Sequence, residues 1–120
     1  MPVDDKHKDF LLKNPARIRY FEDHILDEAL CLAAIKSDPH VINLINIKHR
    51  TPLVCAVAFD LDPNTFKYIP HSSQNLKMCF QSSLLSDGGM DEYINPIFKD
   101  DVEKLKCISK KIYLNSQIRF

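Results

Sequence analysis

The stretch DPHVINLINIKHRTPLVCAVAFDLDPNTFKYI, residues 38–69, begins with an Asp-Pro pair that returns 24 residues later at Asp62-Pro63. Counting back by the same interval leads to Asn14-Pro15, where Asn again precedes Pro. Self-similarity at a fixed period is typical of arrays of stacked supersecondary units, so the sequence predicts an internal repeat. The three aligned segments, which need no gaps, are residues 14–37, 38–61 and 62–85.

Each aligned segment contains two helix starts. Asn or Asp before Pro begins a helix well, because the side chain accepts an orphan N–H and proline gives up a donor that had no partner. Thirteen residues further on stand Asp27, Thr51 and Asn75, which are all good N-caps. We therefore predict a short helix over about 15–21, 39–45 and 63–69, and a longer one over about 28–37, 52–61 and 76–85.

The longer predicted helices are apolar on nearly all sides. In residues 28–37 an apolar stripe includes Cys31 and Ala34, and Leu32 and Ala33 extend it to the opposite side. A helix of this kind needs neighbours on both flanks, which stacked helical pairs supply. The predicted fold is all-α, a short solenoid of stacked helical hairpins with N- and C-terminal capping helices.

The two ends of the chain depart from the repeat. Residues 1–13 are predicted as an N-terminal capping helix, and the register fails after Leu85 at SDGGMDEY. Residues 86–99 are then a connector with one helical turn over 93–98, and residues 100–120 form a C-terminal capping helix and tail. Candidate buried positions of that helix are Val102, Leu105, Cys107, Ile108, Ile112 and Leu114.

The composition indicates a single globular domain over residues 1–120. Hydrophobic residues make up 45% and charged residues 27%, which excludes a disordered chain and a membrane-embedded one. Sixteen basic and sixteen acidic side chains cancel, so the global field of a general nucleic-acid binder is missing. The start, MPVDDKHKDF, has no apolar leader and the four cysteines form no C-x-x-C pair. We therefore expect reduced thiols, a cytoplasmic location and no membrane contact.

Two resemblances follow from these residues. RTPLVCAVA, residues 50–58, resembles the start of an ankyrin repeat, although the period is 24 residues rather than the 33 of ankyrin. ALCLAAIKSDPHVINLI followed by LVCAVAFDLDPNTFKYIP resembles a short α-hairpin repeat family of unknown function known from bacteria, viruses and protists. That second resemblance covers residues 14–85. Both resemblances imply a helical solenoid used for protein recognition, and neither brings a catalytic motif.

The residues capable of chemistry favour a structural interpretation. Thiols 24 residues apart on successive helices would lie about 10 Å apart, whereas zinc needs each sulfur at about 2.3 Å. Cys31, Cys55 and Cys79 are therefore predicted to pack in the core as small apolar side chains. The hydrolase, nucleotide-binding and deaminase motifs are missing, so we expect no enzyme activity, no cofactor and no metal.

The segments that link each short helix to the next long one carry His24, His49 and His71. Stacking would place these segments along one edge, whose charge runs from acidic through basic to neutral and could select an oriented protein partner. A histidine ridge there could bind metal or sense pH, but we expect ordinary surface histidines. The predicted partner-binding residues, called the linking edge below, are Glu22, Asp23, His24, Lys48, His49, Arg50, His71 and Gln74.

A rival surface lies on the third long helix, which has no full fourth segment beside it. Phe80, Leu84 and Leu85 are expected to be covered by the C-terminal helix; if that helix moved, they would be open to a partner or to a second copy. Lys110 and Lys111 lie on that helix and complete this secondary surface.

The function predicted from the sequence is a non-catalytic protein–protein interaction module that acts as a monomer or weak homodimer. Its size suits an adaptor or a small inhibitor, including the kind of effector that a virus or bacterium directs against a protein in the cytoplasm of a host cell. The alternative is a nucleic-acid-associated module that uses the basic C-terminal helix with Lys104, Lys106 and Arg119, although we do not expect nucleic acid as the partner. An enzyme would have to use a cysteine nucleophile.

Overall fold

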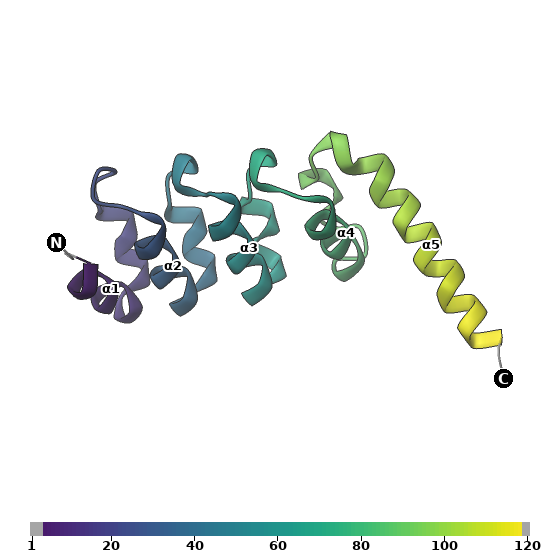
Figure 1. The fold of residues 1–120 in the computed structure, drawn as a ribbon, viewed down its shortest axis with the longest axis horizontal. Helices are drawn as coiled ribbons and strands as arrows, with labels where there is room; N and C mark the ends of the chain where they lie inside the picture. Colours follow the sequence, from purple (N-terminus) through teal and green to yellow (C-terminus); the bar gives the residue numbers. More distant parts are fainter. Residues whose placement is uncertain (1–3, 119–120) are drawn as a thin grey trace. The chain divides into compact units, whose positions relative to one another are not determined.

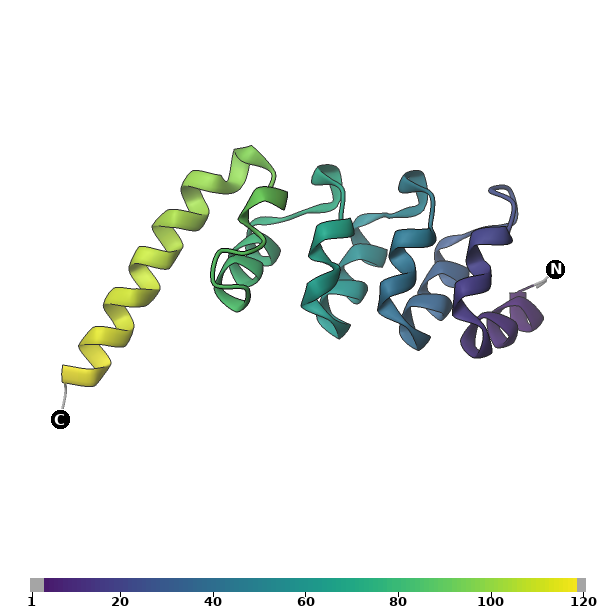
Figure 2. The ribbon, with the colours of Figure 1, turned by 180° about the vertical axis from the view of Figure 1, so that it is seen from behind.

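The computed structural model describes the backbone of residues 4–118 and the side chains of residues 7–110. Helices joined by turns and short extended links make up this range, which contains no β-strand, so the all-α prediction is confirmed (Figures 1 and 2). The chain divides between Ser73 and Gln74 into two compact units, which are described separately below. The prediction that residues 1–120 act as one domain stays a prediction.

The first unit alternates α-helices with short 3-10 helices. Helix α2 packs against both α1 and α3, and η2 packs against both η1 and η4. The Ser37 hydroxyl at the end of α2 donates to the carbonyl of Leu12 near the end of α1, at 2.6 Å. The elements are α1 (Asp4–Lys13), η1 (Pro15–Tyr20), α2 (Glu28–Ser37), η2 (Pro39–Leu44), η3 (Ile47–His49), α3 (Pro52–Leu61), η4 (Pro63–Tyr68) and η5 (His71–Ser73).

The predicted starts of the long helices are confirmed, and so are their bounds. Each N-cap side chain accepts a hydrogen bond from the backbone N–H three residues later, which satisfies a donor that the helix itself leaves unpaired. Asp27 accepts from Leu30 at 2.8 Å, Thr51 from Val54 at 3.3 Å and Asn75 from Met78 at 2.8 Å.

The short helices differ from the prediction in type. They are six-residue 3-10 helices, and a segment this short closes with i→i+3 bonds more readily than with a full α-helical turn. Asp38 and Asp62 cap their helices by accepting from the N–H two residues later. Asn14 makes no such bond, because it follows α1 directly and its side-chain amide donates to the Phe10 carbonyl instead.

The aligned columns form the buried interior of the first unit. Ile18, Ile42 and Phe66, one from each short helix, are fully buried or nearly so. Cys31 and Cys55 are fully buried on α2 and α3, which confirms the prediction that these thiols pack in the core. The rings of Phe59 and Phe66 meet edge to face at 6.1 Å between centroids.

The second unit holds α4 (Leu76–Leu85), η6 (Asp91–Tyr93), η7 (Pro96–Phe98) and α5 (Lys99–Ile118), and α4 packs against α5. After α4 the chain turns through Asp87 and Gly88, whose φ angles of 52° and 84° lie in the left-handed region that favours glycine. Cys79 and Val102 are buried as predicted. The prediction that Cys107 and Ile108 are buried is wrong, since both are exposed on α5, and Leu105 is half-buried. The side chains of Ile112 and Leu114 lie outside the described residues.

Candidate functional site

The linking segments of the first unit gather at one edge. The turn before α2 and the helices η3 and η5 project on the same side of the unit, which is the upper side in Figure 1 and again in Figure 2. Glu22, Asp23 and His24 lie in the first of these segments and are exposed. Lys48 and His71, in η3 and η5, are exposed as well. The fold therefore places most of the linking edge where a partner could touch it.

Ion pairs join the first two linking segments. The Lys48 ammonium lies 2.8 Å from Asp23 Oδ2, and His49 Nε2 lies 3.5 Å from Asp23 Oδ1. The hydrogen bond from Lys48 holds the pKa of the Asp23 carboxyl below its usual value. The predicted change of charge along the linking edge, from acidic to basic, is therefore partly neutralised. Asp23 of the first segment contacts Lys48 and His49 of the second. His24 Nδ1 lies 3.3 Å from Glu22 Oε2 in a further pair, and both side chains are highly exposed.

Arg50 does not present its charge to solvent as the sequence suggested. Its half-buried guanidinium donates to three backbone carbonyls, those of Ile45 at 2.9 Å, Tyr68 at 2.8 Å and Asn43 at 3.2 Å. Its own carbonyl accepts the Ser73 hydroxyl at 2.6 Å. Arg50 therefore holds the linking segment in place, so the expectation that its charge faces solvent needs correction, whereas its contact with a partner stays a prediction.

The prediction that Gln74 lies exposed on the linking edge also needs correction. Its side chain is only 8% exposed, within the second unit. The amide donates to the Tyr93 carbonyl at 2.7 Å and accepts the Asn95 N–H at 2.8 Å. The Cys79 thiol lies 3.3 Å from the same amide oxygen. A side chain engaged on all these sides has no surface left for a partner.

A groove of about 530 Å³ opens between the first two linking segments. Ile18, Leu26 and Ile45 line it and are buried, whereas Ile47 lines it and is 62% exposed. Arg50, a predicted partner contact, lines it as well. Sequence reasoning did not select the further lining residues Arg19, Phe21, Asn43, Leu44 and Asn46. Asp23 lines it too, so the linking edge and this linking groove are parts of one surface.

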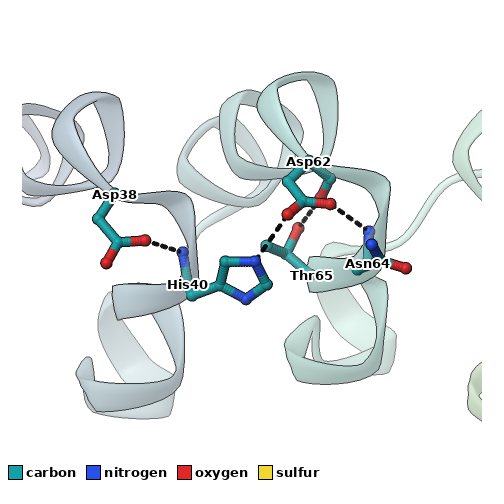
Figure 3. Close-up of polar contacts among 5 residues, drawn as sticks. All are labelled: Asp38, His40, Asp62, Asn64 and Thr65. Carbon is teal, nitrogen blue, oxygen red and sulfur yellow. Dashed lines mark hydrogen bonds and ion pairs between the residues drawn. The ribbon is translucent and has the colours of Figure 1, made fainter.

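His40 makes a contact that sequence reasoning missed. Its Nε2 lies 2.6 Å from Asp62 Oδ2, so the start of η2 is tied to the start of η4 (Figure 3). The Asp62 carboxylate also accepts a hydrogen bond from the Asn64 N–H at 2.9 Å, and the backbone carbonyl of Asp62 accepts one from the Thr65 hydroxyl at 2.8 Å. The hydrogen bond from the Asn64 N–H is the largest cause that lowers the pKa of the Asp62 carboxyl, and the hydrogen bond from His40 is the next. The aligned column offered no signal, because Ala16 and Asn64 take the place of His40 in the other segments.

The predicted secondary surface is partly open in the second unit. Leu84 is 49% and Leu85 67% exposed, so the expected cover by α5 is wrong for both, while Phe80 is half-buried. Lys110 is exposed, and the side chain of Lys111 lies outside the described residues. Lys106 lies 3.4 Å from Glu103 and 4.0 Å from Asp91, so acidic groups share the basic helix surface. This mixture gives the nucleic-acid alternative no added support.

The buried cysteines have the properties of core residues. Burial raises the pKa of Cys31, Cys55 and Cys79 to about 11 in each case. A thiol with such a pKa stays protonated near neutral pH, and the thiolate is the reactive form. Among the described side chains no group of His, Cys, Asp and Glu is arranged to hold a metal ion.

Comparisons with known proteins leave the family open. No protein-family model matches the chain, and searches of curated proteins and of solved structures found no match either. Within the described part of the chain, no helix has the length and apolar character needed to span a membrane.

Proposed function

We propose that the chain is a short solenoid of stacked helical hairpins, closed by capping helices, which acts as a non-catalytic protein-binding module. Support for the architecture comes from the sequence period and from the side-by-side packing of α1, α2 and α3. The resemblance to a short α-hairpin repeat family points the same way. In this proposal the exposed linking-edge residues of the first unit and the linking groove form the binding face.

One observation carries the proposal, the contact of Asp23 with Lys48 and His49 beside the linking groove. It holds two exposed segments against each other, and these segments rest on packed helices. Binding residues are often found on loops that a rigid scaffold positions, because ordering them beforehand lowers the entropy lost on binding. Exposed Ile47 next to charged Asp23 and Lys48 combines apolar contact area with groups that orient a partner.

The biological role that fits this module is that of an adaptor or a small inhibitor. Such a protein needs no catalytic group, because it acts by occupying a surface of another protein. We extend the proposal to an effector of viral or bacterial type acting in the cytoplasm of a host cell, on the strength of the family resemblance alone.

Charge reversal at the linking edge tests the proposal. Tagged protein is used to capture partners from the cell in which the chain occurs, with Asp23→Lys and Lys48→Glu introduced singly. Arg50 stays unchanged, because its side chain holds three backbone carbonyls. We expect each reversal to reduce capture of the specific partner, whereas Lys67→Glu, at an exposed site on η4, leaves it intact. Capture that is unchanged in both edge variants rules out this binding face.

A further inference from the structure

The linking groove lies at an aligned column that is apolar in the first segment and polar in the next two. Leu26, Arg50 and Gln74 occupy the same column, each just before the N-cap of a long helix. Arg50 and Gln74 use their polar ends to hold backbone groups further along the chain. Leu26 is buried and lines the groove, but its side chain has no donor. The first aligned segment therefore lacks the polar side chain that the next segment has.

The alignment identifies the backbone groups that this change leaves open. The three carbonyls that accept from Arg50 belong to Asn43, Ile45 and Tyr68. Twenty-four residues earlier, the corresponding positions are Arg19, Phe21 and Leu44, and all three residues line the groove. Within the described residues, no hydrogen bond is donated to any of these three carbonyls by a side chain or by backbone outside the helices.

The charged residues that line the groove are one acid, Asp23, and two bases, Arg19 and Arg50. The Asp23 carboxylate lines it, and the side chain of Glu22 is exposed in the adjacent position. Three cations line the groove or lie close by, and each is engaged. The Lys48 ammonium contacts Asp23, and the Arg19 guanidinium lies 5.5 Å from the centre of the Tyr20 ring. The Arg50 guanidinium donates to three backbone carbonyls. Carbonyl oxygens and a carboxylate are all acceptors, so a ligand has to supply donors only.

We propose that the linking groove binds the guanidinium of an arginine side chain presented by the partner protein. A guanidinium has five N–H donors in a fixed plane and no acceptor, which suits carbonyls contributed by different segments of the chain. Arg50 provides a precedent within the same chain, since its guanidinium spans the equivalent three carbonyls in the next segment. This inference rests on the proposed function and specifies what the binding face recognises.

The test uses the whole protein labelled with ¹⁵N and a Gly-Arg-Gly peptide as probe. We expect amide shifts confined to residues 19–26 and 43–47, with a dissociation constant in the millimolar range of about 1–10 mM. The same peptide with citrulline, which replaces the cation by a neutral urea group, should bind at least about tenfold more weakly. A lysine peptide, whose ammonium lacks the planar fork, should lie between the two.

Two variants of the protein sharpen the result. Leu26→Arg supplies the missing guanidinium from within, so it should remove peptide binding. Its matched control is Leu53→Arg, which adds the same charge at a half-exposed position of α3 and should leave binding unchanged. Asp23→Asn should weaken binding about two- to fivefold, as expected for an exposed ion pair. Amide spectra of each variant check that the fold is kept.

The outcomes separate this inference from the proposed function. If Gly-Arg-Gly shifts no groove amides, or if the citrulline peptide binds equally well, the arginine site is wrong, even where edge reversals reduce partner capture. If the peptide binds as described but partner capture is insensitive to the edge, the site stands and the proposed function fails. Peptide binding that survives in Leu26→Arg also overturns the inference, because the groove would then not be the binding site.

Discussion

Arg50 and Gln74 stand in the same aligned column, yet they stabilise their surroundings by different chemistry. Arg50, in the first unit, is half-buried and its partners are all carbonyls, so a donor-only group that still reaches water suits the site. Gln74, in the second unit, is buried and faces both acceptors and donors, among them the Tyr93 carbonyl and the Asn95 N–H, so its site suits a neutral group with a donor and an acceptor. The difference shows that exposure and the set of partners decide which polar residue a column can hold.

The largest effect is expected at Gln74. Gln74→Ala removes the amide that joins the Tyr93 carbonyl to the Asn95 N–H and opens a cavity around them. We expect the free energy of unfolding to fall by about 3 kcal/mol, since lost hydrogen bonds in a buried setting and lost packing both contribute. Urea unfolding measures this value, and Gln81→Ala, the same change at a half-buried site of α4, is the control. A loss equal to that of the control would show that the Gln74 amide does not hold this segment.

A smaller effect is expected at Arg50. Arg50→Ala removes three donors, but water reaches this half-buried site and can hydrate the carbonyls that remain. We therefore expect a loss of about 2 kcal/mol in the free energy of unfolding, within the range for hydrogen bonds to charged groups. Arg50→Lys should restore less than half of it, because an ammonium cannot reproduce the planar fork. Arg17→Ala, at an exposed site, should change the stability little. Full rescue by lysine would contradict this account.

The same comparison shows what could be predicted from the sequence. The long helices were predicted with their bounds because Asp27, Thr51 and Asn75 act through bonds to N–H groups three residues away. Such local capping depends little on the rest of the fold. The 3-10 type of the short helices was not predicted, because over six residues the two helix types differ little in sequence preference.

The exposure of the linking edge was predicted correctly in outline and wrongly in detail. Polar residues in a linking segment are expected to be solvated, which holds for Asp23 and Lys48 but not for Arg50 and Gln74. The aligned column contained a usable signal, since apolar Leu26 shows that this position faces inward. The linking groove itself could not be predicted, because residues of two linking segments, among them Asp23 and Ile47, line it together.

The smallest effect concerns the contact between His40 and Asp62, which joins η2 to η4 in the first unit (Figure 3). His40→Ala removes a hydrogen bond from the carboxylate, so the lowered pKa of Asp62 should rise. The rise should stop short of the ordinary value, because the Asn64 N–H is the larger cause of the lowering and remains. NMR titration of the Asp62 carboxyl measures this pKa directly, and His24→Ala, at the exposed pair with Glu22, should leave it unchanged.

The direction of the pH dependence of stability follows from the lowered pKa of Asp62. Because the pKa is lower in the folded state, the stability that this group contributes is fully present above its unfolded pKa of about 3.9. That contribution is lost as the pH falls through the folded pKa. Stability measured through this acidic range should therefore fall less steeply in His40→Ala than in the unchanged protein. Equal slopes in the two proteins would show that the 2.6 Å contact does not bias the titration of Asp62.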